Sequence, residues 1–409
     1  MRTLNYIDLF AGAGGLSEGF IKNGFNPIAH VEMDAAACLT LKTRIAWHHL
    51  HEKGKQPLYS KYLKGEISQE ELYLHVPASK LETVIQAEIS DLTLPSIFKR
   101  IDKFSKSNKI DLIIGGPPCQ AYSLVGRGRD LNGMRDDKRN YLFKYYAEFL
   151  KKYRPKYFVF ENVKGLLYSD GYLDQMLDLF QSPEVDYQVR YKLLDASNFG
   201  VLQSRERLII IGKRGKKPFE YPTFHETENP WKISSDLFAD LPKLKPGEGC
   251  RWTPYAGNTT KYLNQFGIRN GLDGIPQHIT RPHNPRDLKI YEKVLDAWLK
   301  ENRRLQYHEL PPDLKTHSKE HVFTDRFKVV NPHGHSHTMV AHISKDGHYY
   351  IHPDPAQNRS ISVREAARIQ SFPDDYFFEG SRSAAFRQIG NAVPPMMASE
   401  IAKVLKSMF

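Results

Sequence analysis

The chain contains little cysteine, and none of its apolar runs is long. Its 409 residues include three cysteines, Cys38, Cys119 and Cys250. They are too few and too scattered for a disulfide framework, which favours a reducing compartment. No apolar stretch approaches the roughly 20 residues that a membrane-spanning helix needs. The first residues lead directly into glycines, without the apolar segment of a signal peptide. We therefore expect a cytoplasmic protein with no membrane partner.

Acidic residues are also relatively scarce. The sequence has 47 Asp and Glu against 58 Lys and Arg, which gives a formal net charge of +11. Such an excess favours a polyanionic partner, although a solvated lysine-rich surface explains it as well. Apolar residues make up 40% of the chain, which is enough for a large core and excludes a disordered protein.

Short β-branched and aromatic runs alternate with helical patterns in the first half of the chain. The alternation predicts an α/β fold with a doubly wound, mostly parallel sheet. We expect strands at residues 6–10, 27–32, 110–114, 157–161, 189–194 and 208–212. We expect helices at residues 16–23, 141–153, 172–180, 363–371 and 395–409.

Composition predicts the domain organisation. Residues 213–330 hold eleven of the 25 prolines and few periodic segments, which indicates a second, smaller, loop-rich domain. The first domain is then formed by residues 1–212, and residues 331–409 return to it. The polar stretch at about 43–81 is interpreted as a surface insertion within the first domain.

A glycine-rich turn follows the first predicted strand. Gly12, Gly14 and Gly15 stand between this strand and a predicted helix, where the backbone can approach a cofactor. Glu32 ends the next predicted strand, where a carboxylate can accept hydrogen bonds from ribose hydroxyls. These residues predict an adenosine-containing cofactor. NAD and S-adenosylmethionine fit on similar terms, and a plain tight turn is a third interpretation. The motif DLFAGAGG favours S-adenosylmethionine, because a sulfonium cofactor has no pyrophosphate for the glycine turn to bind.

A cysteine follows the buried strand at 110–114. Two prolines precede Cys119 in GGPPCQ and restrict the backbone at the sheet edge where α/β proteins bind ligands. The alternative is a buried, inert thiol. Glu161 ends the next apolar strand and is expected in a partly desolvated cleft, where a carboxyl can hold or donate a proton. Together the two predict a nucleophile and an acid.

Two arginines precede the predicted strand at 208–212. Arg205 and Arg207 in QSRER lie on the same side of an extended chain, because side chains repeat with period two. They are expected to clamp a phosphate or a base carbonyl, or to lower the pKa of the thiol. Edge-strand salt bridges are the alternative.

In chain order, these motifs resemble the C5-cytosine DNA methyltransferases of the bacterial restriction-modification type. GGPPCQAYS at 115–123 is similar to the catalytic loop of that family, ENV at 161–163 to its acid motif and QSRER at 203–207 to its arginine motif. RNYLF at 139–143, RSISVREAAR at 359–368 and QIGNAVPP at 388–395 resemble three further motifs. The likeness covers both ends and most of the chain.

The resemblance implies a fold, a reaction and a set of site residues. The fold is that of a class I, Rossmann-like methyltransferase with a target-recognition domain. The reaction transfers a methyl group from S-adenosylmethionine to C5 of a flipped-out cytosine in a specific duplex DNA sequence. Cys119 would add to C6 and Glu161 would contact N3, with Arg205 and Arg207 also catalytic. The implied cofactor residues are Phe10, Ala11, Gly12, Gly14, Gly15, Leu16, Glu32, Met33, Glu88, Ile89, Pro117, Asn391 and Ala392. The implied DNA-binding residues are Gln120, Ser123, Arg127 and Arg139.

The resemblance leaves several points open. Glu88 stands where the family usually has an aspartate that meets the adenine, and Asp91 is the alternative. A tRNA cytosine-5 methyltransferase, an NAD-dependent oxidoreductase and a non-catalytic DNA-binding regulator are the competing functions. A companion restriction endonuclease, a monomeric state and a place in the bacterial cytosol or nucleoid are expected.

The second domain is expected to read the DNA sequence. Candidates for guanine contacts are Arg251, Arg269, Arg281 and Arg286, which stand in loop-like settings. The alternating histidines His333, His335 and His337 have the spacing of a metal tract, but polar loop residues explain them better and no metal is expected.

Overall fold

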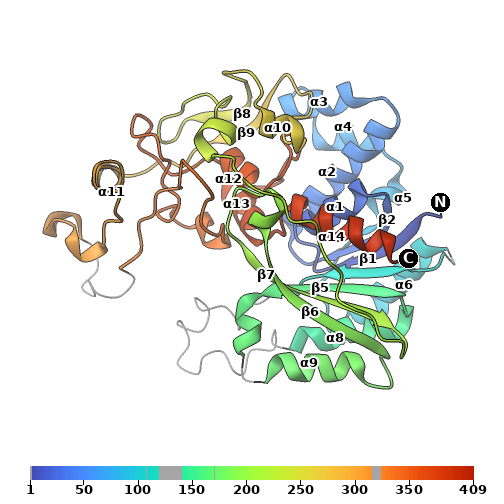
Figure 1. Cartoon of the computed structure of the whole chain (residues 1–409). Coiled ribbons are helices and arrows are strands. Elements are labelled where there is room, and N and C mark those ends of the chain that lie inside the picture. Colours follow the sequence, from blue (N-terminus) through green and yellow to red (C-terminus); the bar gives the residue numbers. More distant parts are fainter. Residues whose placement is uncertain (1, 107, 119–140, 170, 316–323) are drawn as a thin grey trace.

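The computed structural model describes residues 2–106, 108–118, 141–169, 171–315 and 324–409. A seven-stranded sheet forms its centre (Figure 1). The strands are β1 (Leu4–Leu9), β2 (Phe25–Glu32), β3 (Val84–Gln86), β4 (Leu112–Gly115), β5 (Tyr157–Val163), β6 (Tyr187–Asp195) and β7 (Glu206–Arg214). Their order is β3-β2-β1-β4-β5-β7-β6, and only β7 runs antiparallel to its neighbours. The predicted mostly parallel α/β sheet is confirmed.

Helices cover both faces of this sheet, which is why its central strands have continuous apolar sequences. One face packs against α6 (Leu94–Ser105), α8 (Leu142–Tyr153) and α9 (Tyr172–Gln181), with Ile7, Leu9 and Phe160 in the shared core. The other face packs against α1 (Gly15–Lys22) and α14 (Pro395–Ser407). The first and last helices of the chain therefore lie side by side (Figure 1).

The segment 43–81, predicted as a polar insertion, is helical and has an apolar core of its own. After α2 (Ala35–Glu52) come α3 (Gln56–Lys64), α4 (Gln69–Leu74) and α5 (Ala78–Leu81). Tyr59, Tyr62 and Leu63 recur at helical spacing and are buried with Leu72 and Phe377. Polar composition hid this pattern, because tyrosine contributes apolar area while its hydroxyl finds a partner.

A second lobe, residues 231–392, packs beside the sheet. It contains β8 (Gly249–Pro254), β9 (Gly274–Ile279), α10 (Lys261–Gln265), α11 (Pro285–Glu301), α12 (Val363–Ile369) and α13 (Arg382–Asn391). Short 3-10 or π segments lie at Lys164–Tyr168, Ala196–Phe199, Ile233–Leu237, Tyr307–Glu309, Pro312–Leu314 and Ala341–Ser344. One apolar core joins residues on both sides of the predicted boundary at 330, Ile275 and Val330 to Ile361 and Phe386 among them. The domain limits at 212 and 330 stay predictions.

A buried arginine holds the second lobe together. Arg368 on α12 is fully buried and lies 2.6 Å from an Asp240 carboxylate oxygen and 2.7 Å from one of Asp374. Burial alone raises the pKa of Asp374, but the Arg368 charge outweighs it and holds this pKa below its ordinary value. Asp240 and Asp374 lie 134 positions apart, so this ion pair network connects the beginning of the lobe to its end.

Replacement of Arg368 by methionine should therefore destabilise the protein strongly. It removes the ion-pair partner of the buried Asp374 and leaves the buried Asp240 with Arg269 alone, which costs about 3–5 kcal/mol of unfolding free energy. Urea denaturation at pH 7.5 measures the loss. The matched control is Lys103→Met, which removes an exposed cation 3.5 Å from Glu82 and should change stability by less than about 1 kcal/mol. Equal effects of the two substitutions would contradict this role of Arg368.

Candidate active site

The carboxyl ends of β1, β2, β4 and β5 meet at one edge of the sheet. Leu9 pairs with Val31 on one side and with Gly115 on the other, and Gly115 pairs with Phe160. The four loops that leave these strands therefore start side by side, which is where parallel sheets bind ligands.

The glycine turn after β1 lies at this edge and faces Glu32. Its backbone is unusual, since Phe10 and Gly12 have φ values of 55° and 53° and Gly14 caps α1 at 81°. The Gly12 amide donates a 2.8 Å hydrogen bond to Glu32 Oε2. The structure thus brings the predicted residues of the turn, Phe10 to Leu16, together with Glu32.

The Glu32 carboxylate is held by backbone amides. Its Oε1 accepts hydrogen bonds from the amides of Met33 and Asp34, at 2.9 and 2.8 Å. Burial raises its pKa, and the three amides, Gly12 included, oppose that shift. A carboxylate has about four acceptor positions, so Oε2 keeps one for a further donor such as a ribose hydroxyl.

The surroundings of Glu32 fit an adenosine-containing cofactor. A Cβ atom built on Gly12 meets no atom within 4 Å, so space is open above the turn. Met33 beside it is 58% exposed, so its apolar side chain is available to contact the face of a base. No group of three or more His, Cys, Asp or Glu that fits a metal ion occurs within the described ranges.

Further predicted cofactor residues border the same edge. Ile89 is buried and Glu88 exposed in the loop after β3. The alternative residue, Asp91, forms a hydrogen bond to Tyr145 and raises its pKa, second to burial, so Glu88 is the freer carboxylate. Asn391 is exposed at the end of α13, and the Ala392 Cβ lies 3.2 Å from a Cβ built on Gly15. The C-terminal motif therefore borders the turn.

Glu161 and Arg207 form an ion pair at the ends of β5 and β7. The Arg207 Nε lies 2.8 Å from Glu161 Oε1, and the two side chains are 11% and 12% exposed. Arg207 is paired in register with Val163, so it reaches Glu161 diagonally across the strands. The partly desolvated position predicted for Glu161 is present, with a permanent cation beside it.

The loop after β4 passes directly over this pair. A Cβ atom on Gly116 would lie 2.4 Å from Glu161 Oε2, so only glycine permits the carboxylate to lie against the loop backbone. Pro117 is buried, and its carbonyl accepts a 3.5 Å hydrogen bond from Asn162 Nδ2. The described part of this loop ends at Pro118. Cys119, Gln120, Ser123, Arg127 and Arg139 lie outside the described residues.

Arg205 lies deeper in the protein than its neighbour Arg207. It is fully buried, and its guanidinium donates to the Met339 carbonyl and, at 3.1 Å, to the Gly390 carbonyl. These main-chain contacts take the guanidinium into the protein, and the prediction that Arg205 clamps a phosphate or base carbonyl, or lowers the pKa of the thiol, stays a prediction. Arg205 thus joins the chain before β7 to the segment that leads into η7 (Ala341–Ser344) and to the last turn of α13.

Three of the four arginines proposed to contact guanine are half-buried and bonded to other groups of the protein. Arg251 donates to the carbonyls of Tyr62 and Leu63, which lie on α3. Arg269 pairs with Asp240 at 3.1 Å, and Arg281 donates to the carbonyls of residues 343–345. Only Arg286 is exposed in the structure. Sequence position in a loop did not reveal these partners.

One group of site residues has no signal in the sequence. Tyr376 donates its hydroxyl hydrogen bond to the Ala13 carbonyl in the glycine turn. Arg44 on α2 bonds to Glu18 in α1 and, at 2.8 Å, to Asp375. These contacts anchor the turn, but those made by Tyr376 and Asp375 join residues more than 300 positions apart, which no local pattern indicates.

Neither described cysteine is a candidate nucleophile. Cys38 is 2% exposed on α2, and burial, with Glu32 nearby, raises the pKa of its thiol to about 12. Cys250 is exposed on β8, where its thiol contacts the Trp252 carbonyl. His337, one of the alternating histidines, stacks on Tyr350 and hydrogen-bonds to the Tyr349 carbonyl.

Thiol labelling should separate these two cysteines. In a Cys119→Ser variant at pH 8, iodoacetamide should modify Cys250 and leave Cys38 unmodified until denaturant is added, because a buried thiol of raised pKa supplies almost no thiolate. Peptide mass spectrometry measures both sites. Modification of Cys38 in the folded protein at a rate similar to Cys250 would contradict its burial.

Comparisons with known proteins agree with this geometry. The family described as C-5 cytosine-specific DNA methylase matches residues 4–64 and 81–407. The chain is 41% identical to the type II methyltransferase M.Bpa9945I of Bacillus paralicheniformis over 98% of both chains. It is 29% identical to the type II methyltransferase M1.HphI of Haemophilus parahaemolyticus over 99% of this chain and 87% of that one.

Solved structures show the same fold. A protein encoded within an E. coli prophage superposes with a TM-score of 0.64 at 24% identity over 99% of both chains. The Entamoeba histolytica methyltransferase EhMeth superposes with a TM-score of 0.55 at 14% identity, over 100% of this chain and 99% of that one. No helix in the described ranges is long and apolar enough to span a membrane. By the match of its sequence to the family, the chain belongs to the C-5 cytosine-specific DNA methylases.

Proposed function

We propose that this DNA cytosine-5 methyltransferase modifies one specific duplex sequence with S-adenosylmethionine as methyl donor, in a type II restriction-modification system. The observation that carries the proposal is the Glu161–Arg207 pair, which lies against the loop leading to Cys119 and at the same edge as the glycine turn. The 41% identical relative, which matches over the full length, is named a type II methyltransferase. A companion endonuclease would cut the same sequence without contacting this protein.

The glycine turn and Glu32 would bind the cofactor. The remaining acceptor position on Glu32 Oε2 suits a ribose hydroxyl, and the exposed Met33 suits one face of the adenine. Glu88 is the carboxylate placed to meet the adenine amino group. When bound, S-adenosylmethionine supplies an electrophilic methyl group on its sulfonium. The open space above Gly12 and the neighbouring Asn391 border that site.

The chain's own residues would activate the cytosine. The Cys119 thiolate would form a bond to C6, and the C5–C6 electron pair would become available at C5 to take the methyl group as its bond to the sulfonium breaks, leaving S-adenosylhomocysteine. Glu161 holds a proton at N3, so that negative charge does not accumulate on the ring. Loss of the C5 proton to a base then restores the double bond and expels the thiolate.

Arg207 would position Glu161 for this task. Its guanidinium holds Oε1 at 2.8 Å, while Oε2 lies against the loop at Gly116. Arg207 thereby keeps the Glu161 carboxylate from rotating away. Less conformational entropy is then lost when the base binds. The C6 face of cytosine is hidden in a duplex, so the base must flip out, at a cost of a few kcal/mol.

DNA is a better supported substrate than tRNA. The matching family is described as a DNA methylase, and both type II relatives match across the chain. The CFT signature expected of the tRNA enzymes is missing from residues 213–330. Reading of the DNA sequence is assigned to that region, with Arg286 as the remaining exposed candidate. We also propose a monomer that works in the bacterial cytosol.

Bisulfite sequencing tests the function directly. An unmethylated plasmid is incubated with the purified protein and S-adenosylmethionine, and cytosines in one recurring sequence should become protected. The Cys119→Ser variant should protect none and still bind the cofactor in calorimetry, because a hydroxyl is a far weaker nucleophile than a thiolate at neutral pH. Turnover by this variant within about ten-fold of wild type would exclude the proposed mechanism.

Substitutions at the ion pair test the two assigned roles. Glu161→Gln should lower kcat by about 10²–10⁴-fold, the contribution of a positioned acid, with little change in KM for DNA. Arg207→Met should lower kcat by a smaller factor, and Arg207→Lys should recover part of it because the charge returns. Arg190→Met, at an exposed arginine on β6, is the control. If Arg207→Met raises KM while kcat stays unchanged, Arg207 contacts DNA instead of positioning Glu161.

A further inference from the structure

The opposite edge of the sheet is strongly basic from β2 to β6. The strands β1, β2, β4, β5 and β6 begin there and β7 ends there, together with the carboxyl ends of α1 and α14. We call this surface the basic edge. Its segments are residues 2–4, 22–26, 106, 108–111, 154–157, 185–187, 213–217 and 406–409. They contain eleven lysines and arginines and two acidic residues, Asp111 and Asp186.

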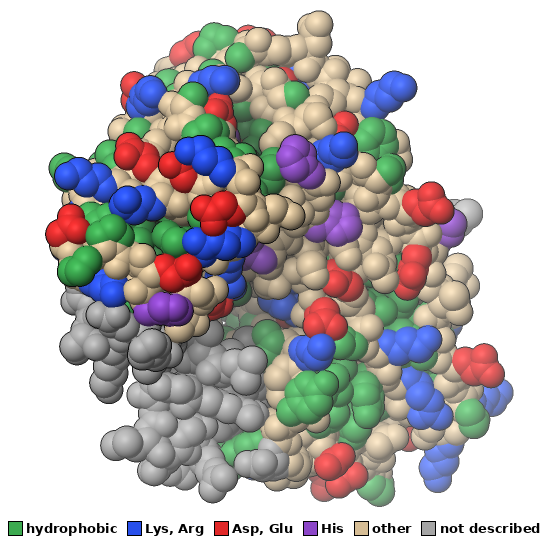
Figure 2. Space-filling view, turned by 60° about the vertical axis from the view of Figure 1, so that its left-hand side comes forward, with side chains coloured by type: hydrophobic (Ala, Val, Ile, Leu, Met, Phe, Trp, Pro, Cys, Tyr) green, Lys and Arg blue, Asp and Glu red, His purple; other side chains and the backbone are tan. Residues whose placement is uncertain are grey.

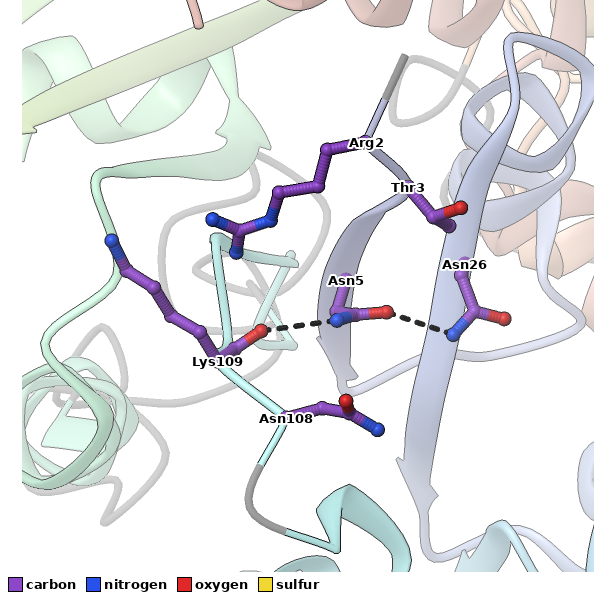
Figure 3. Close-up of a pocket in the computed structure, with 6 residues that line it drawn as sticks. All are labelled: Arg2, Thr3, Asn5, Asn26, Asn108 and Lys109. Carbon is purple, nitrogen blue, oxygen red and sulfur yellow. Dashed lines mark hydrogen bonds between the residues drawn. The ribbon is translucent and has the colours of Figure 1, made fainter.

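Hydrogen bonds show that these segments form one continuous row. Asn26 Nδ2 donates to Asn5 Oδ1 at 2.9 Å, and Asn5 Nδ2 donates to the Lys109 carbonyl at 3.1 Å (Figure 3). The Lys156 amide then donates to the Asp111 carbonyl, and the Arg214 amide to the Lys156 carbonyl, both at 3.0 Å. Because neighbouring strands lie about 4.8 Å apart, the row follows the sheet edge for roughly 20 Å.

Most of the positive charge on the basic edge is not neutralised. Asp111 pairs with Arg2 at 2.8 Å and Asp186 with Arg154 at 3.6 Å. Within the described parts of the chain, no carboxylate lies within 4 Å of the exposed Lys109. The same holds for Lys216 and Lys217, which are also exposed.

Like charges also crowd the half-buried Lys156. Burial lowers its pKa first, and the charges of Lys213 and Lys109 lower it further. Its ammonium group donates to the carbonyls of Met408 and Phe409. The basic edge thus concentrates cations that repel one another unless an anion joins them.

A polar pocket opens within the basic edge. It is lined by Arg2, Thr3, Asn5, Asn26, Asn108 and Lys109 (Figure 3). Cationic groups and side-chain amides are the donors that bind phosphate oxygens in protein–DNA contacts. By contrast, basic and acidic side chains are interspersed on the face of the molecule shown in Figure 2.

We propose that the basic edge binds the phosphate backbone of a second duplex DNA segment while the candidate active site holds the target cytosine. The seven residues of β5 separate the two edges by about 23 Å, and the basic edge lies at the opposite ends of the strands from the candidate active site. The substrate is a long polyanion, so a second contact on the same molecule acts at a high effective concentration. The enzyme would then pass between distant segments of one DNA molecule without leaving it.

Binding of a second duplex to the occupied enzyme tests this proposal. The full-length protein is saturated with an unlabelled 30-base-pair duplex that contains its site, then titrated with fluorescent poly(dA)·poly(dT), which has no cytosine. Wild type should bind the second duplex with affinity that falls steeply with salt. The variant Lys109→Gln/Lys216→Gln/Lys217→Gln should bind it about ten-fold or more weakly. The slope of log K against log salt should be less steep by about 2–3, since each lost phosphate contact removes roughly 0.9.

The control variant has the same net charge change. Lys53→Gln/Lys61→Gln/Lys99→Gln removes three exposed lysines around α2, α3 and α6 and should keep second-duplex binding within about two-fold. Methyl transfer to the 30-base-pair duplex should be unchanged in both variants, while transfer between two sites on one plasmid should slow in the first. If the triple variant is unstable, Lys216→Gln/Lys217→Gln carries the same test with a smaller shift.

Four results would overturn the proposal. In the first, the saturated wild-type enzyme fails to bind the second duplex. In the second, the edge variant and the control variant lose second-duplex binding equally, which makes net charge the cause of that binding. Alternatively, the edge variant loses methyl transfer on the short duplex, so the edge serves the target complex. In the last case, vesicles with 30% phosphatidylserine bind wild type but not the edge variant, and the edge variant still binds poly(dA)·poly(dT) as wild type does. That result would identify a lipid surface as the partner of the basic edge.

Discussion

The close contact between the first and last helices is the constraint on which the candidate site depends. A Cβ atom on Gly15 would lie 2.3 Å from the Val393 carbonyl, and one on Gly19 would lie 2.4 Å from the Ala398 backbone. Only glycine permits α1 to approach α14 so closely. The turn that begins α1 faces Glu32, and the residues that begin α14 follow Asn391 and Ala392. One helix contact therefore places both halves of the proposed cofactor site.

The sheet could be predicted from the sequence because its strands are buried on both faces. Continuous apolar runs such as Leu112–Gly115 and Tyr157–Val163 have few other interpretations. Their carboxyl ends also indicated Glu32 and Glu161, since chemistry-bearing residues at the end of an apolar strand stand out. The helices at 43–81 could not be identified in this way. Their core consists of tyrosines and a few leucines, and it is completed by Phe377, more than 300 residues away.

The arginines show where sequence reasoning stopped. Arg205 and Arg207 have the same spacing and the same charge, and period-two alternation puts them on one side of the chain. Arg207 lies within β7 and reaches Glu161, whereas Arg205 precedes the strand and bonds to carbonyls of two segments from the C-terminal third. A guanidinium has five N–H donors, so it can bind either a carboxylate or main-chain carbonyls. Only the fold decides between them.

The second lobe also has a consequence for the order in which the protein folds. Its core joins residues 233–275 to residues 330–392, and Arg368 supplies the charge that Asp240 requires. During synthesis, Asp240 leaves the ribosome more than a hundred residues before Arg368, and the sheet lacks α14 until residues 395–407 have been made. Contacts of such long sequence separation form late. The nascent chain therefore exposes half-built cores until residues 363–407 have been made, so chaperone demand and sensitivity to truncation should concentrate in that stretch.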